Sequence, residues 1–61
     1  MQGDAIYFRR RAAEERAAAG IAAHPVARQA HIDMAERYED LATSIVARES
    51  QLGLGTPLAA E

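Results

Sequence analysis

The chain contains no cysteine, no tryptophan and no lysine, and its only aromatic residues are Tyr7, Phe8 and Tyr38. A domain of 61 residues buries only about 60% of the surface that its unfolded chain exposes, so it needs disulfides, a metal ion, very regular packing or a partner. The absence of cysteine removes the first of these. Fifteen of the thirty apolar residues are alanine, which favours helix but contributes little buried area. Composition therefore predicts a helical chain with a thin core.

The chain also has no large excess of positive or negative charge. Nine acidic residues against seven arginines leave a net charge of −2, which argues against a dedicated nucleic-acid or anionic-membrane binder. No run approaches the roughly 20 apolar residues of a membrane span. The apolar segment 6–8 is followed at once by three arginines, which is the wrong order for a secretory signal. We therefore expect no membrane association and a cytoplasmic location.

Two helices are predicted, over residues 4–23 and 25–51. Asp4 suits a helix N-cap, and good helix formers follow it. Pro25 disfavours helical geometry at the residue before it and is favoured at the first position of a new helix, which leaves His24 as the N-cap of the second helix. The glycines and the proline of segment 53–61 predict a flexible C-terminal tail after a hairpin that spans residues 1–52.

A connection this short predicts an antiparallel helical hairpin. The second helix carries an apolar stripe at heptad-like spacing, with Ala35, Ala42 and Val46 extending it sideways. The stripe consists of Ala27, His31, Met34, Tyr38, Leu41, Ile45, Arg48 and Leu52. In the first helix, 3.6-residue periodicity predicts a packed face of mostly small residues, made of Ile6, Ala13, Ala17, Gly20 and Ile21. We expect Ala17 opposite His31, Ala13 opposite Met34, and Ile6 with Phe8 opposite Leu41 and Ile45.

One hairpin cannot cover all of this apolar surface, because the second helix extends beyond the start of the first and leaves Val46 and Leu52 without an intramolecular neighbour. Association of two hairpins into a four-helix bundle is the simplest remedy. The fold class that we expect is therefore all-α, a two-helix hairpin that dimerises. The residues predicted to mediate self-association are Met34, Tyr38, Leu41, Ile45, Val46 and Leu52.

The most basic segment of the chain is Arg9 to Arg11, with Arg16 one turn further on. Such arginines beside Tyr7 and Phe8 could hold phosphates and stack on bases. However, consecutive helical residues point in directions about 100° apart, and acidic partners are available at i+4 and across the hairpin. The alternative interpretation, which we favour, is ion pairing of Arg10 with Glu14, of Arg11 with Glu15, and of the arginines with the acidic segment 36–40.

Other candidate chemistry is weaker. His24 and His31 share a helical face, but a zinc site needs further ligands, so we expect His31 to be a boundary residue that hydrogen-bonds a neighbour. The carboxylates of the second helix lie away from the apolar stripe, with Asp33 paired to Arg37, and are expected in solvent. Tyr38 is predicted to be a core residue whose hydroxyl reaches the edge. Thr43 and Ser44 have no neighbouring base, so neither catalytic residues nor a cofactor are predicted.

Residues 7–42 resemble a pattern of short bacterial helical-hairpin proteins of unassigned function. The shared parts are an aromatic-plus-arginine start, an ERAAA-like first helix, a turn that ends in proline, and an AR-x-AH…AERYE-x-LA second helix. This resemblance implies a helical hairpin that stands alone, and it implies no activity.

The function that these observations favour is a non-enzymatic interaction module, a homodimer that docks on a protein partner not identified by the sequence. An alternative is a nucleic-acid-associated regulator that uses Arg9, Arg10, Arg11 and Arg16. A metal-binding bundle built around His31 is the third hypothesis.

Overall fold

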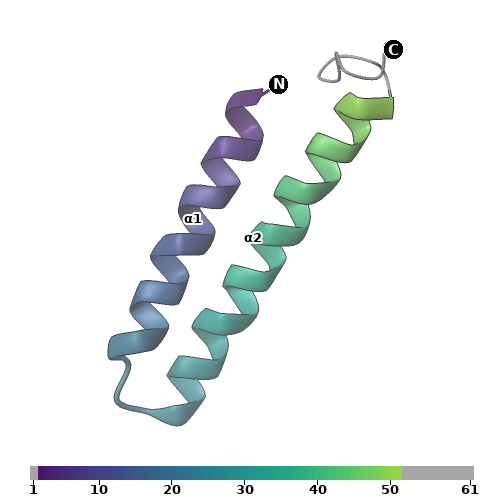
Figure 1. The fold of residues 1–61 in the computed structure, drawn as a ribbon. Helices are drawn as coiled ribbons and strands as arrows, with labels where there is room; N and C mark the ends of the chain where they lie inside the picture. Colours follow the sequence, from purple (N-terminus) through teal and green to yellow (C-terminus); the bar gives the residue numbers. More distant parts are fainter. Residues whose placement is uncertain (1, 52–61) are drawn as a thin grey trace.

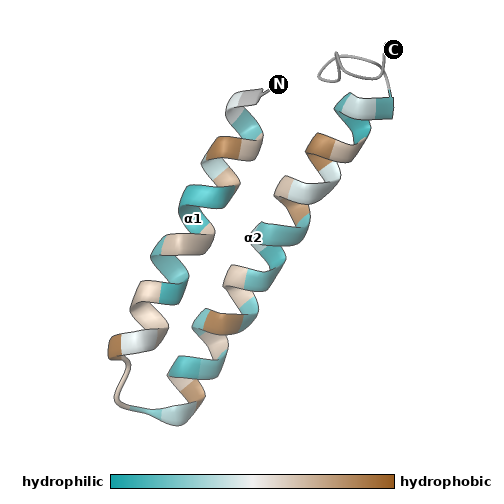
Figure 2. Ribbon diagram, viewed as in Figure 1, coloured by the Kyte–Doolittle hydropathy of each residue, from teal (hydrophilic) through white to brown (hydrophobic). Residues whose placement is uncertain are grey.

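The computed structural model describes residues 2–51, which form two antiparallel helices, α1 (Gln2–Ile21) and α2 (Pro25–Gln51), joined by a three-residue turn (Figure 1). The predicted all-α hairpin is confirmed. Leu52 and the predicted tail 53–61 lie outside the described residues. Hydrophobic segments are short and separated by hydrophilic ones along both helices (Figure 2). Within residues 2–51, neither helix is apolar over a stretch long enough to cross a lipid bilayer.

The first helix begins and ends two residues earlier than predicted. Asp4 lies inside the first turn, where its charge still favours the positive end of the helix dipole, and it is not the N-cap. At the other end, α1 stops at Ile21, and the Ala22 N–H donates to the Ala19 carbonyl at 3.3 Å, a tight closing turn of the kind common at helix ends.

The second helix begins at Pro25 as predicted, with His24 as its cap. The Val26 N–H donates to His24 Nδ1 at 3.2 Å, and the Arg28 N–H donates to the His24 carbonyl at 3.0 Å. Proline has no N–H to satisfy at this position. The His24 imidazole nitrogen therefore accepts the hydrogen bond that a serine or aspartate oxygen usually accepts at an N-cap.

The core between the helices is built on alanine. Ala5, Ala12 and Ala19 recur every seven residues on α1 and face Ala35 and Ala42 on α2, and all five are buried. No large side chain in the described residues is fully buried. Alanine lets two helix backbones approach closely, but each buried alanine removes little apolar area from water, so the hairpin has close packing and a small core.

A second set of inward residues alternates with the alanines at spacings of three and four, as the heptad geometry of packed helices requires. Its members are less buried, most are larger than alanine, and several are polar. They are Phe8 and Glu15 on α1, Ala22 in the turn, and His31, Tyr38 and Ile45 on α2.

The prediction of which face of α1 is packed is wrong. Ile6 is 58% exposed, Ile21 is 86% exposed, and Ala13, Ala17 and Gly20 are exposed as well. That face has large side chains only at its two ends. The face that the hairpin uses instead offers closely spaced alanines, the Phe8 ring and a carboxylate for His31.

The centre of the α2 stripe is also displaced from the prediction. Ala35 and Ala42 occupy the middle, whereas Met34 and Leu41 lie at the edge with 42% and 40% of their surface exposed, and Ala27 and Arg48 are exposed. The cross-helix register shifts accordingly. His31 meets Glu15 in place of the predicted Ala17.

Candidate interaction surface

The hairpin has two broad faces, one on each side of the plane through its helix axes. The first is defined by large side chains that come from or flank the second inward set: Tyr7, Phe8, Met34, Tyr38, Leu41 and Ile45. We call it the aromatic face. The second is defined by the side chains that flank the alanine rows: Ile6, Arg9, Arg16, Ile32, Glu39 and Val46. We call it the alanine face.

Aromatic packing links the two helices on the aromatic face. The Phe8 and Tyr38 rings stack with their centroids 5.9 Å apart and their planes at 22°. Tyr7 lies edge-on to Phe8 at 5.3 Å, and the Arg11 guanidinium lies 5.2 Å from the Tyr38 ring centroid, within the range of a cation–π contact. These rings are half-buried or exposed. The hairpin therefore holds its aromatic side chains in place without covering them.

Glu15 connects the helices next to this cluster. Only 8% of the residue is exposed, and its two carboxylate oxygens have different partners. Arg11 Nη2 donates to Oε2 at 2.8 Å, and His31 Nδ1 lies 2.6 Å from Oε1. Because an ionised carboxylate only accepts hydrogen bonds, Nδ1 carries the proton. Both acceptors are thus satisfied, as a buried charge requires.

These contacts shift the pKa values of Glu15 and Arg11. The hydrogen bond from His31, helped by Arg11, holds the pKa of Glu15 below its ordinary value of 4.5, although desolvation acts in the opposite direction. The hydrogen bond to Glu14, helped by the proximity of Tyr38, raises the pKa of Arg11. Arg11 therefore spans Glu14, Glu15 and the Tyr38 ring. The predicted hydrogen bond of His31 to a neighbour is confirmed, and so is the pairing of Arg11 with Glu15.

A second ion pair joins the helices on the alanine face. Arg16 donates to Glu39 through Nε and Nη2, each at 2.8 Å. This bidentate geometry is the strong form of the arginine–carboxylate contact. The contact with Glu39 raises the pKa of Arg16 and lowers that of Glu39.

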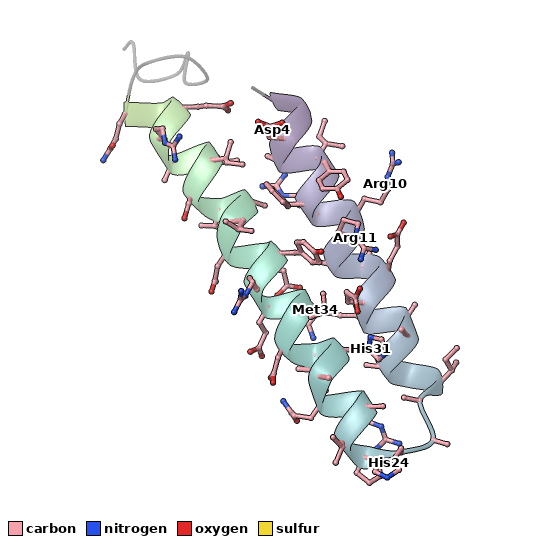
Figure 3. All side chains as sticks on the ribbon, turned by 180° about the vertical axis from the view of Figure 1, so that it is seen from behind. Asp4, Arg10, Arg11, His24, His31 and Met34 are labelled. Atoms are coloured by element: carbon pink, nitrogen blue, oxygen red, sulfur yellow. The ribbon has the colours of Figure 1, made fainter. Side chains whose placement is uncertain are left out.

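The four arginines of the predicted polar patch do not share one surface. Figure 3 shows Arg10 pointing away from the hairpin, whereas Arg11 lies over Tyr38 on the aromatic face. Arg16 binds Glu39 on the alanine face, and Arg9, seven residues before Arg16, shares that face. The predicted pair of Arg10 with Glu14 is wrong, because Glu14 binds Arg11. Asp33 accepts from Gln29 at 2.8 Å, in place of the predicted Arg37.

The predicted self-association residues are divided between the two faces. Met34, Tyr38, Leu41 and Ile45 all lie on the aromatic face, whereas Val46, seven residues after Glu39, lies on the alanine face with 39% of its surface exposed. Leu52 is outside the described residues. Four of the six residues thus form a continuous stripe beside Phe8 and Tyr7.

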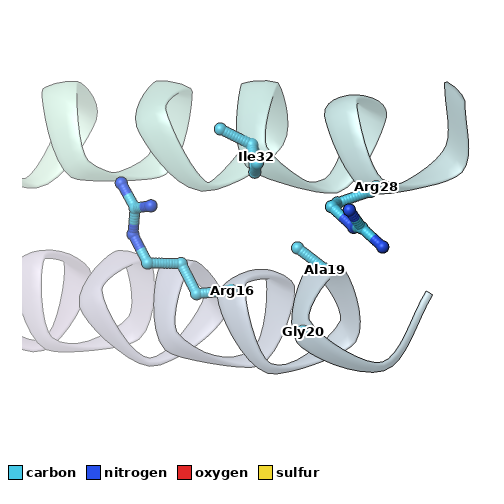
Figure 4. A pocket seen from close by; sticks show the side chains of 5 residues that line it. All are labelled: Arg16, Ala19, Gly20, Arg28 and Ile32. Atoms are coloured by element: carbon cyan, nitrogen blue, oxygen red, sulfur yellow. The ribbon is translucent and has the colours of Figure 1, made fainter. Parts of the chain in front are cut away.

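The alanine face has a shallow hollow near the turn, lined by Arg16, Ala19, Gly20, Arg28 and Ile32 (Figure 4). Its floor is the close-packed alanine row and the helical Gly20, where a Cβ would meet nothing within 4 Å. Arg28 also donates from Nη2 to the Ala22 carbonyl at 3.1 Å, which caps the end of α1. Among residues 2–51, no group of three or more histidine or acidic side chains comes together as metal ligands.

Two features of this surface differ from what the sequence predicts. Glu15 was expected only as the partner of Arg11, although its spacing of seven from both Phe8 and Ala22 is the signal that it points inward. The apolar tip was also missed. Ile21 and Val26, with 86% and 71% of their surface exposed, flank the turn on both sides, and their position within four residues of Pro25 was the available signal.

A comparison with protein families, with curated proteins and with solved structures found no match to this chain.

Proposed function

We propose that the chain is a non-enzymatic interaction module that acts as a homodimer and docks on a protein partner. The observation that carries this proposal is the distribution of its large apolar side chains. None in the described residues is fully buried, and Tyr7, Met34 and Leu41 lie together on the aromatic face with at least 40% of their surface exposed. A single hairpin leaves this apolar surface in water, and a contiguous exposed apolar patch typically marks an interface.

Self-association uses the aromatic face. Aromatic side chains that are already ordered by stacking bind at a lower entropic cost than flexible ones. Phe8 and Tyr38 are held in this way, and Arg11 is fixed above Tyr38. The aromatic face thus combines large apolar groups with little remaining freedom.

The protein partner uses the surface that the second copy leaves open. The alanine face offers Ile32 in the hollow beside Gly20 and the exposed Ile6 and Val46 near the opposite end of the hairpin, and the tip offers Ile21 and Val26. Between Arg16 and Arg28 the sequence has no acidic or arginine residue, and the nearest charged side chains are Arg28, which binds the Ala22 carbonyl, and Asp33, which lines a hollow with Val26.

Photo-crosslinking in the cells that make the protein tests both parts of this proposal. A photoreactive phenylalanine at Met34 is expected to trap a second copy, and one at Val46 is expected to trap a different protein. The same group at Asp40, on the outer edge of α2, is the control and is expected to trap neither. Failure of the Met34 position to trap a second copy contradicts the homodimer, and failure of the Val46 position and of one at Ile21 to trap any protein contradicts the partner.

The alternative is a nucleic-acid-associated regulator that uses Arg9, Arg10, Arg11 and Arg16. Against it, Arg11 and Arg16 are already paired with carboxylates, so their capacity for phosphate is largely neutralised. The remaining two, Arg9 and Arg10, are consecutive helical residues whose side chains point in directions about 100° apart. Fluorescence anisotropy with duplex DNA over a salt series separates the proposals, because a sub-micromolar affinity with a steep salt dependence favours the regulator.

A further inference from the structure

The charges on the aromatic face are segregated by helix. The α1 half carries Asp4, Glu14, Glu15 and Arg11, which sum to −2, and the α2 half carries Arg37 and Arg48, which sum to +2 with His31 neutral. Within residues 2–51, neither Arg37 nor Arg48 lies within ion-pair distance of a carboxylate. One face thus presents an acidic strip and a basic strip side by side.

Two symmetric arrangements place the aromatic faces of two copies together. If the two-fold axis runs along the hairpin, α1 of each copy packs against α2 of the other, and both turns lie at the same end. If the axis runs across the hairpin, α1 packs against α1 and α2 against α2, with the turns at opposite ends. An interface between two copies of one chain must repeat the same patch in this self-complementary way.

We infer that a second copy of this chain binds the aromatic face with the two-fold axis along the hairpin, so that the acidic α1 strip meets the basic α2 strip. This inference rests on the proposed homodimer. It brings opposite charges together at both contacts, whereas the crossed arrangement opposes like charges at both. Like charges brought together at an interface are costly, so electrostatic complementarity selects orientation.

The aromatic face is large enough to bind a second copy of the chain. The 20 residues of α1 make a helix about 30 Å long, and two helices about 10 Å wide give a projected face of about 600 Å². A standard interface removes roughly 800 Å² of accessible surface from each partner, and projecting side chains make accessible surface larger than projected area. The aromatic face alone can therefore support the contact.

Spin labels at the turn test the arrangement directly, because the natural chain has no cysteine and Ala23 is exposed. In Ala23→Cys labelled with a nitroxide, the axial arrangement predicts a distance between labels of about 20 Å, two helix diameters. The crossed arrangement predicts about 30 Å or more, at least the length of α1. A dimer with the long distance overturns the arrangement and leaves the proposed function intact, whereas a monomer with no dipolar distance overturns the homodimer itself.

Charge reversal gives an independent test. Arg37→Glu with Arg48→Glu makes both strips acidic, so the axial arrangement predicts a dimer dissociation constant raised by about tenfold or more. Arg9→Glu with Arg10→Glu changes the net charge equally outside the aromatic face and is the matched control. If the first variant dimerises like the control, the acidic and basic strips do not face each other and the arrangement is wrong.

Discussion

The aromatic face and the alanine face lie on opposite sides of the same two helices, yet they are stabilised in different ways. Ala35 is completely buried beneath the alanine face, whereas Met34, its neighbour in sequence, is 42% exposed on the aromatic face. Alanine completes its packing within one hairpin because it is small. Larger side chains need a second layer, and one hairpin does not supply it. Close packing and apolar burial are therefore provided by different rows of residues.

The largest expected effect comes from enlarging the alanine row. Ala35→Leu inserts three carbons at a residue that is 0% exposed between the helices, so it should lower the free energy of unfolding by ~1–3 kcal/mol through overpacking. The control, Ala47→Leu, makes the same change at an exposed position of α2 and should alter stability by less than about 0.5 kcal/mol. Urea unfolding followed by circular dichroism measures both. Equal effects would mean that the alanine row is not the close contact.

Truncating one side chain of nearly equal exposure on each face compares how much each face contributes to dimerisation. Leu41 and Val46 are 40% and 39% exposed, but only Leu41 lies on the aromatic face. Leu41→Ala should raise the dimer dissociation constant about tenfold, the equivalent of about 1.4 kcal/mol of lost burial. Val46→Ala should change it by less than about twofold. Light scattering over a concentration series is the measurement, and the reverse order would place the dimer contact on the alanine face.

Glu15 and Glu14 are adjacent in sequence and both bind Arg11, but only Glu15 also reaches α2. Its pKa is lowered in the folded chain, so it stabilises the fold at a pH above its unfolded value of about 4.5, and this stability is lost as the pH falls through the lower, folded value. Glu15→Gln should therefore be less stable than the natural chain at pH 7 and should lose less further stability on acidification. Glu14→Gln should keep the natural pH profile in melts from pH 7 to pH 3.

The smallest effect is expected at Arg9 and Arg10, which have no carboxylate partner among residues 2–51. Arg9→Gln with Arg10→Gln should leave thermal stability unchanged, because both residues are exposed and surface changes are usually neutral. Arg11→Gln should lower stability, since it removes contacts to two carboxylates and a ring.

Binding of the natural chain to duplex DNA should be no tighter than about 10⁻⁴ M at physiological salt. A sub-micromolar affinity that disappears in the Arg9 and Arg10 variant would reverse the ranking of the two functions.

The hairpin was predictable because local signals dominate it. Pro25 interrupts a run of helix formers, and both the start of α2 and the antiparallel arrangement follow from that residue. The His31 hydrogen bond was also predictable, since a histidine at the boundary of a helix interface needs a partner.

The rotation of each helix was not predictable in the same way. With alanine at so many positions, several faces of α1 have nearly the same apolar content, and shifting the face by one residue changes little in a sum of hydrophobicities. The choice depends on cross-helix contacts, namely Phe8 on Tyr38 and Glu15 with His31. These pairs exist only once the register is set. The predicted patch at Met34 to Ile45 holds together despite this because its members share one edge of α2.

Sedimentation equilibrium of the unaltered chain tests the central claim, that the aromatic face is an interface, most directly. At about 10 µM, we expect a mass twice the 6.6 kDa of the chain and a thermal midpoint that rises with concentration. A mass of 6.6 kDa with full helicity and a midpoint independent of concentration would show that one hairpin is stable with its aromatic face in water, so that this face is not a dimer interface.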